Sequence, residues 1–287
     1  MDYLLVIIST VLLACNFAIS KRYQLTEGVS MERGLRFNMY LGLTTTVIFF
    51  VVSGFRVEFS WFSVLMAFLT SFCTVSYVVL GFSVMKAGNM ALYTLFLMSG
   101  GMMLPYIFGV AFLGEMLSVW RVLGLLLILV AVILSNKSDK PVSKKVLALC
   151  IAIFVFNGFV SICSKCHQVA TKYPTVENTD FVLFTGLTKC IMSFVALQFC
   201  KKERPVFSFA KKGSVLLAAG SAALSGISYS FQLMGAKELP ATVLYPMITG
   251  GAIIFTAISA RIFFKEKPTK AQLISIVLCF IGTLLFL

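Results

Sequence analysis

The chain has 287 residues, of which 59% are hydrophobic and 12% charged, and its mean hydropathy is +0.97. This composition excludes a soluble globular domain and is typical of an all-α polytopic membrane protein. The net charge of +13 does not indicate a nucleic-acid partner, because the Lys and Arg residues lie in short connections between apolar runs, where they act as topology signals. We therefore expect the lipid bilayer to surround most of the chain.

Ten apolar runs are long enough to cross about 30 Å of hydrocarbon as transmembrane helices. In chain order they cover residues 3–20, 37–54, 61–85, 90–113, 118–135, 146–164, 180–200, 213–235, 240–264 and 270–287. The first run lacks a preceding basic segment, so we interpret it as a retained span rather than a signal peptide. The hydrophilic connection 137–145 separates five runs from five. This predicts an N-terminal unit, 1–136, and a C-terminal unit, 146–287.

Two runs of equal length, 89–113 and 240–264, are each interrupted near the centre by a Gly-Gly pair and by a proline. Hydrophobic segments broken at matching places in two halves are typical of a transporter site near the bilayer midplane. We expect these pairs to act as hinges, formed by Gly100, Gly101, Gly250 and Gly251. The alternative is ordinary packing, because glycine lets helices approach closely.

The two halves also match outside these runs. Gly42-Leu43-Thr44 superposes on Gly186-Leu187-Thr188, and Ser63-Val64-Leu65 superposes on Ser214-Val215-Leu216. Each unit has an odd number of spans, so the second must enter the membrane in the opposite sense to the first. The sequence therefore predicts two inverted five-helix repeats.

Motifs that follow the interrupted runs carry a resemblance to a known family. They are Phe112-Leu113-Gly114-Glu115 followed by Ser118, Arg121 and Gly124, Phe263-Phe264-Lys265-Glu266 followed by Thr269, Gln272 and Gly282, and the segments Asn16-Phe17-Ala18-Ile19-Ser20-Lys21 and Leu35-Arg36-Phe37. Through these residues the whole chain resembles the drug/metabolite transporter superfamily, specifically its EamA-type ten-span branch. The resemblance implies a carrier but leaves the cargo open, because the family moves amino acids, drugs, nucleotide sugars, sugar phosphates and other metabolites on one scaffold.

Lys and Arg residues are concentrated in the connections after odd-numbered runs. The positive-inside rule places those connections in the cytoplasm and both termini outside it, in a multi-pass protein of the cell (inner) membrane. Many members of the resembled family are described with both termini in the cytoplasm. Here we follow the charges, because the asymmetry is large.

Ionisable residues at membrane depth are the first candidates for function. Every Asp and Glu maps to a terminus or to the end of a run, so the intramembrane carboxylate of the small multidrug exporters in this superfamily has no counterpart here. Glu115 and Glu266 are expected at the N-termini of the fifth and tenth spans, where they suit the helix dipole. Lys189 lies near the centre of the seventh run, and we expect it to face a cavity and attract a carboxylate or phosphate. The alternative is a lysine that snorkels, is neutral, or bonds helix carbonyls.

Other polar residues share helical faces and complete the expected substrate site. They are Tyr245, Thr249, Tyr229, Tyr77, Thr94, Asn157 and Asn16. Buried tyrosines and amides offer hydrogen bonds while their rings supply apolar contact. For any one of them, bonding between helices without a ligand is an equally good interpretation.

One short segment, Cys163 to His167, matches the C-x-x-C-H pattern of haem attachment. The equivalent segment of the first half, 20–24, has neither Cys nor His, so we expect no metal and no cofactor. The single His and the dispersed Cys and Ser residues also offer no catalytic triad, which predicts that the protein is not an enzyme.

These observations predict a secondary transporter that moves a small polar metabolite, an amino acid or an organic anion, by alternating access. One alternative is a flippase for a lipid or a lipid-linked sugar, which would need a groove open to the bilayer. Another is a membrane receptor or scaffold that binds without transporting. The expected partners are a small-molecule substrate and the lipid bilayer, and the sequence leaves room for a homodimer.

Overall fold

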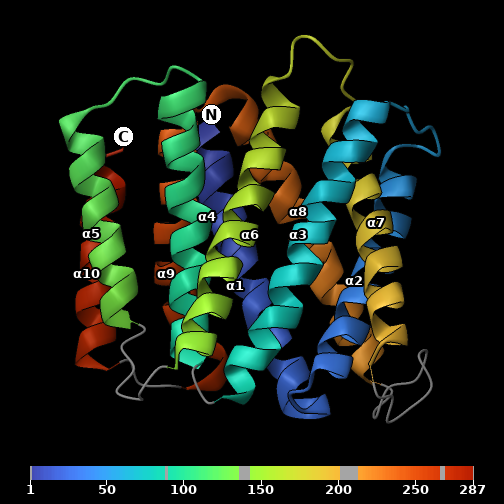
Figure 1. Cartoon of the computed structure of the whole chain (residues 1–287), viewed down its shortest axis with the longest axis horizontal. Coiled ribbons are helices and arrows are strands. Elements are labelled where there is room, and N and C mark those ends of the chain that lie inside the picture. The colour runs from blue at the N-terminus through green and yellow to red at the C-terminus, as the bar shows by residue number, and fades with distance from the viewer. Residues whose placement is uncertain (1, 88–89, 136–142, 201–212, 266–268, 287) are drawn as a thin grey trace.

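The computed structural model describes residues 2–87, 90–135, 143–200, 213–265 and 269–286, and every regular element in these ranges is a helix (Figure 1). The helices are α1 (Asp2–Glu27), α2 (Met31–Val52), α3 (Trp61–Lys86), α4 (Met90–Phe112), α5 (Val119–Ser135), α6 (Lys144–Val169), α7 (Asn178–Gln198), α8 (Gly213–Glu238), α9 (Ala241–Phe264) and α10 (Lys270–Leu284). The expected all-α polytopic fold is confirmed. Eight helices of the described chain are long and apolar enough to cross a membrane, whereas α5 and α10 are shorter.

Side-chain caps fix where several helices begin. Ser30, Ser60 and Ser143 each accept a hydrogen bond from the backbone N–H three residues later, and Thr269 forms a capping box with Gln272. Between α1 and α2 the chain turns at Gly28, whose φ of 87° favours glycine. Because α1 continues to Glu27, it is longer than the apolar run 3–20 from which it was predicted.

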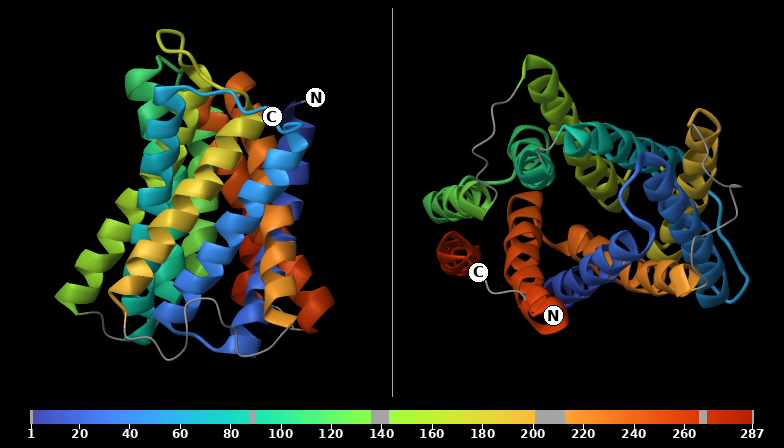
Figure 2. Two further views of the ribbon diagram at one scale, coloured as in Figure 1. Left: turned by 90° about the vertical axis from the view of Figure 1, so that its right-hand side faces the viewer. Right: turned by 90° about the horizontal axis from the view of Figure 1, so that it is seen from below.

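The contacts between helices arrange eight of them in two rows (Figure 2). One row follows the order α4, α6, α3, α7, and the other follows α9, α1, α8, α2. Contacts between α2 and α7 join the rows at one end, and contacts between α4 and α9 join them at the other, where α5 and α10 pair with each other. Each row becomes the other when helix n is exchanged with helix n+5, as an internal repeat requires.

Helices n and n+5 run in opposite directions along the bundle, and both termini lie at the same end, the upper end in Figure 1. We call this the upper end and the opposite one the lower end. The connections after α2, α4, α6 and α8 also lie at the upper end. The division of the chain into units 1–136 and 146–287, and the side of the membrane that each end faces, stay predictions.

Large apolar side chains cover the outside of the bundle. On α7, for example, Leu187, Ile191, Phe194 and Val195 are 40–53% exposed and follow one face of the helix. A soluble protein rarely exposes so much contiguous apolar surface, whereas lipid tails solvate it without cost. The inward faces carry most of the buried polar groups, and the candidate site lies among them.

Candidate functional site

A small polar cavity lies between the two rows, where α6, α8 and α9 meet. It has a volume of about 50 Å³, and its polar lining consists of Ser161, Ser164, Tyr229, Gln232 and Tyr245. These serines are five and eight residues from the upper end of α6, which corresponds to a depth of about 7 to 12 Å. The cavity therefore lies in the upper half of the bundle rather than at its midplane.

Hydrogen bonds hold the walls of this cavity together. The hydroxyl groups of Ser164 and Tyr229 are 2.7 Å apart. Tyr245 donates to the carbonyl oxygen of Ser161 at 2.6 Å. Helices α6, α8 and α9 thus meet at the hydroxyls of Tyr229 and Tyr245, two residues of the expected substrate site.

Lys189 lies half-way along α7, one turn below Thr185. The exposed residues Leu187 and Ile191 point away from it at 100° per residue, so Lys189 occupies the face of α7 that is turned toward the other helices. Its side chain is half-buried, and within the described ranges it has no hydrogen bond or ion pair. Ser193, one turn further down, is fully buried and its hydroxyl also has no partner there.

The other predicted residues lie apart from the cavity or already have protein partners. Thr249 is buried one turn along α9 from Tyr245, on the same face. Asn157 donates to the carbonyl oxygen of Leu97 at 2.7 Å and so joins α6 to α4. Asn16 accepts a hydrogen bond from Ser221 and joins α1 to α8. For these two asparagines the structure shows bonding between helices, the alternative considered above.

Tyr77 and Thr94 lie in the lower half of the bundle, away from Tyr229 and Tyr245. Tyr77 packs with Tyr93 and apolar residues of α3, α4 and α6 around the buried Ile153. Thr94 is half-buried near the lower end of α4. From the sequence pattern we expected these residues on the inside of the bundle. The pattern did not show that they lie at a different height from Tyr229 and Tyr245.

The four expected hinge glycines lie inside unbroken helices, since α4 and α9 continue through Pro105 and Pro246. Each glycine permits close approach to another element. A Cβ at Gly100 would lie 2.2 Å from the carbonyl oxygen of Phe154, and one at Gly101 would lie 2.6 Å from Asn157 Nδ2. The equivalent atoms at Gly250 and Gly251 would meet Thr283 and Thr10. In this conformation the glycines are packing sites, and their role as hinges stays a prediction.

At the upper end, buried polar groups tie α6 to α3. Ser63 Oγ lies 2.9 Å from His167 Nε2 and accepts a hydrogen bond from the backbone N–H of Val176 at 3.0 Å. His167 is 1% exposed and its ring stacks on Phe181 at 3.8 Å. We call the hydrogen-bonded group Ser63, His167 and Val176 the upper clasp.

At the lower end, Ser214 Oγ donates to Glu27 Oε1 at 2.5 Å, and both side chains are buried. We call this pair the lower clasp. It joins the end of α1 to the start of α8, as the upper clasp joins the end of α6 to the start of α3. Ser63 and Ser214 are the residues that superpose in the two halves of the sequence.

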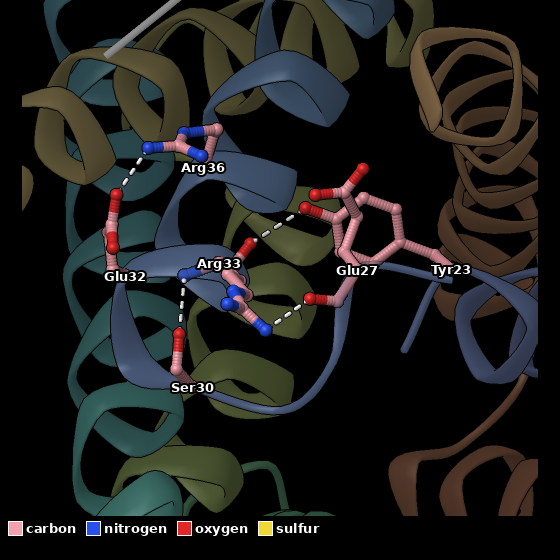
Figure 3. A network of polar contacts seen from close by, with 6 residues as sticks. All are labelled: Tyr23, Glu27, Ser30, Glu32, Arg33 and Arg36. Atoms are coloured by element: carbon pink, nitrogen blue, oxygen red, sulfur yellow. Dashed lines mark hydrogen bonds and ion pairs between the residues drawn. The ribbon is translucent and has the colours of Figure 1, made fainter. Parts of the chain in front are cut away.

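Around Glu27 the turn between α1 and α2 is fixed by further polar contacts (Figure 3). Arg33 donates to the backbone oxygen of Glu27, and Tyr23 donates to the carbonyl oxygen of Arg33 at 3.0 Å. One turn further along α2, Arg36 and Glu32 form a buried ion pair. Arg33 and Arg36 were counted as residues of a connection in the sequence, but both lie inside α2.

Two charged residues near the upper end cap other helices. Lys165, which the sequence also placed in a connection, is buried in α6 and donates to the carbonyl oxygens of Ala236 and Leu239 at 2.7 and 2.6 Å. Glu115 accepts hydrogen bonds from the backbone N–H groups of Ala241 and Thr242 at 2.6 and 2.8 Å. It therefore caps α9, whereas we had expected it to cap α5. Glu266 lies outside the described residues.

His167 of the haem-like segment is buried and occupied by protein contacts. The ring nitrogens of His167 are hydrogen-bonded to Ser63 and, at 3.0 Å, to Gln168. Cys163 and Cys166 are free thiols. Within the described residues no cluster of three or more His, Cys, Asp or Glu could hold a metal ion.

Comparison with known proteins shows similarity to one family model and to solved structures. The model of the EamA-like transporter family matches residues 144–287, half of the chain. A crystal structure of a protein superposes with a TM-score of 0.79 and 13% sequence identity, over 99% of this chain and 95% of the other. At that identity the likeness concerns the fold alone. The comparison with curated proteins found no match.

Proposed function

Because the chain belongs to the EamA-like transporter family, we propose that it is a secondary transporter for a small polar metabolite with a carboxylate or phosphate group, such as an amino acid or an organic anion. The observation that carries this proposal is the position of Lys189, on the inward face at the middle of α7 and without a protein partner in the described chain. A charged lysine at this depth costs about 2.5 kcal/mol or more unless it has a counter-charge. The anionic group of the substrate supplies that counter-charge.

In this proposal, the polar cavity between α6, α8 and α9 supplies the rest of the binding site. Tyr229, Gln232 and Tyr245 present two hydroxyl groups and an amide, which can exchange their present partners for a substrate. The tyrosine rings offer apolar surface to the remainder of the molecule. A metabolite with one anionic end and a polar middle fits this arrangement better than a large cationic drug, for which the described spans contain no carboxylate at mid-depth.

The size of the cavity requires the helices to move. Its volume of about 50 Å³ is sufficient for a water molecule, whereas sites for small-molecule ligands have volumes of about 300 Å³ or more. We propose that the upper and lower clasps open in turn, so that Lys189 becomes accessible from one end at a time. This is alternating access, with Ser63 and Ser214 at equivalent points of the two gates.

In this proposal, solute gradients supply the driving force for transport. Acidic residues of the described chain lie at helix ends, as Glu27, Glu115 and Asp180 do, and none is placed for proton exchange at mid-membrane. A uniporter or a substrate exchanger fits this distribution. A receptor or scaffold on the same fold would bind the anion without moving it, and a lipid flippase would move a larger molecule.

The test combines binding with flux. Purified protein is screened by thermal stability against anionic, zwitterionic and cationic metabolites, because a ligand that binds the native state raises apparent stability. We expect anions to stabilise the wild type and Lys189→Arg. Lys189→Met should weaken their binding about 30-fold or more, since removal of one partner of a buried charge pair costs about 2 kcal/mol or more.

The control is Lys237→Met, which removes an exposed lysine from the upper end of α8. Its anion binding should equal that of the wild type. Uptake of the stabilising compound into liposomes then distinguishes a transporter from a receptor. Stabilisation by cations alone, or equal anion binding by Lys189→Met and wild type, would overturn the proposal.

A further inference from the structure

A second and much larger cavity lies between α3 and α6, with a volume of about 600 Å³. Its walls are almost entirely apolar and include Phe62, Met66 and Leu69 of α3 and Ile162, Cys166 and Val169 of α6. We call it the α3–α6 groove. It is within the size range of ligand sites, about 300 to 1,000 Å³, yet it offers hardly any hydrogen-bonding groups to a polar metabolite.

The α3–α6 groove is separate from the proposed transport site. Phe159, which lines it, is 47% exposed and continues the exposed stripe of Ile151 and Val155 along α6. Ser161 and Ser164, which line the polar cavity, lie on the opposite face of the same helix. The groove therefore opens outward, to the hydrocarbon that surrounds the bundle.

The length of the groove matches one leaflet of a bilayer. Along α3 it extends from Phe62, one residue after the helix begins, to Cys73, which is about 16 Å deeper. Along α6 it extends from Val169, the last residue of the helix, to Phe159, about 15 Å deeper. These depths are close to half of the hydrocarbon thickness of about 30 Å. An acyl chain that enters from one leaflet fits this length.

Polar residues occur where the groove reaches the membrane surface. Its upper rim is formed by Thr171, Lys172 and Tyr173, in the connection that follows α6, and the Tyr173 ring stacks on Phe62 at 5.0 Å. Trp61 begins α3 at the same level and is 80% exposed. Trp and Tyr are enriched where a chain crosses the membrane–water interface. This rim therefore lies at the depth of the lipid headgroups.

Lys172 is the one charged residue that lines the groove, and it is exposed. In the described part of the chain it has no ion pair or hydrogen bond. A cation at headgroup level attracts anionic lipids. The arrangement of an apolar channel one leaflet deep, with a single cation at its outer end, is complementary to an anionic phospholipid.

We propose that the α3–α6 groove binds one anionic phospholipid, with an acyl chain between α3 and α6 and its phosphate against Lys172. The lipid is a bound partner and not the transported molecule, because the groove opens outward, whereas Lys189 and the polar cavity lie on inward faces of the bundle. Helices α3 and α6 are also the two helices joined by the upper clasp, so the lipid packs directly behind the Ser63–His167 contact.

Native mass spectrometry of the purified protein tests this, after exchange into detergent with phosphatidylglycerol or phosphatidylcholine of the same acyl chains. We expect the wild type to retain one phosphatidylglycerol molecule and to prefer it over phosphatidylcholine at least fivefold. Lys172→Gln should keep a bound lipid but lose this preference. Lys237→Gln, which changes an exposed lysine at the same end of the bundle, should behave like the wild type.

The second variant, Cys166→Trp, fills the groove and should lose both lipids while keeping the helical circular dichroism spectrum of the wild type. Should Cys166→Trp fail to fold, Lys172→Gln on its exposed connection still decides the result. An unchanged preference in Lys172→Gln, or retention of the lipid by folded Cys166→Trp, would overturn the proposal. Lipid retention is measured without any flux assay. The proposal of lipid binding can therefore fail or succeed independently of the proposed transport.

Discussion

Ser63 and Ser214 are equivalent residues at the starts of α3 and α8, and each joins its helix to the end of a neighbouring helix, at opposite ends of the bundle. Ser63 bonds to His167 of α6 at 2.9 Å at the upper end, and Ser214 bonds to Glu27 of α1 at 2.5 Å at the lower end. The serine is kept in both halves while its partner differs, an imidazole above and a carboxylate below. The two clasps therefore share an equivalent serine but have different chemistry.

Removal of either serine should open one gate selectively. In a background without the eight native cysteines, Gln232→Cys places a reporter thiol in the polar cavity. We expect Ser63→Ala to increase labelling of that thiol by a small impermeant maleimide added from the side of the upper end, because His167 and the Val176 N–H lose their partner. Ser214→Ala should increase labelling from the other side. If each variant increased labelling equally from both sides, the clasps would not be gates.

The surroundings of the paired glycines in the structure allow a prediction about packing that could not be made from the sequence alone. An added Cβ at Gly100 would lie 2.2 Å from a backbone oxygen of α6, whereas one at Gly251 would lie 2.9 to 3.1 Å from the side-chain atoms of Thr10. We expect Gly100→Ala to lower the free energy of unfolding by about 1 to 3 kcal/mol, the range typical of overpacking, and Gly251→Ala by less. Thermal denaturation in detergent measures both.

The matched control is Gly213→Ala at the exposed start of α8, where no atom lies within 4 Å of an added Cβ. This variant should be neutral or slightly stabilising, because alanine reduces the freedom of the unfolded chain. Equal changes of stability in Gly100→Ala and Gly213→Ala would show that the contact with α6 does not decide the effect. Transport by Gly100→Leu and Gly251→Leu at the wild-type rate would disprove the hinge role.

Tyr229 joins α8 to α6 in the polar cavity through its hydroxyl group. Tyr229→Phe keeps the ring but leaves Ser164 without its partner at 2.7 Å. We expect this variant to fold and to bind the anion about 3- to 10-fold more weakly, which corresponds to a net hydrogen-bond contribution of about 0.5 to 1.5 kcal/mol. Tyr77→Phe, which lies outside the cavity, is the control and should bind as the wild type does. Isothermal titration with the compound found in the stability screen measures both affinities.

Hydrophobic periodicity and internal matches predicted the ten helices, because each apolar run is long and is bounded by polar residues. They also placed Tyr229, Tyr245 and Lys189 on inward faces. They could not find the role of Ser63, since short hydroxyl side chains occur throughout apolar runs and its partner His167 is more than 100 residues away in sequence. They misplaced Lys165, because a lysine near the end of a run resembles a topology signal until the carbonyl groups that surround it are known.

Glu115 is another residue whose contacts could not be predicted from the sequence. The motif in which it lies suggested the start of the next helix, α5, but its two oxygens accept the N–H groups of Ala241 and Thr242 at the start of α9. A carboxylate at this position satisfies two unpaired donors and also interacts favourably with the helix dipole. Glu115 thus links the turn between α4 and α5 to the other half of the chain.

We expect Glu115→Gln to lower the free energy of unfolding by about 1.5 to 3 kcal/mol, because the amide can accept one hydrogen bond but turns its NH₂ group toward the second donor. Glu58→Gln, a change of an exposed carboxylate at the same end of the bundle, should alter stability by less than about 0.5 kcal/mol. Urea or thermal denaturation of both variants gives the comparison. A loss in Glu115→Gln no larger than in Glu58→Gln would mean that water satisfies the start of α9, and that the contact between the two halves at this point contributes nothing to the fold.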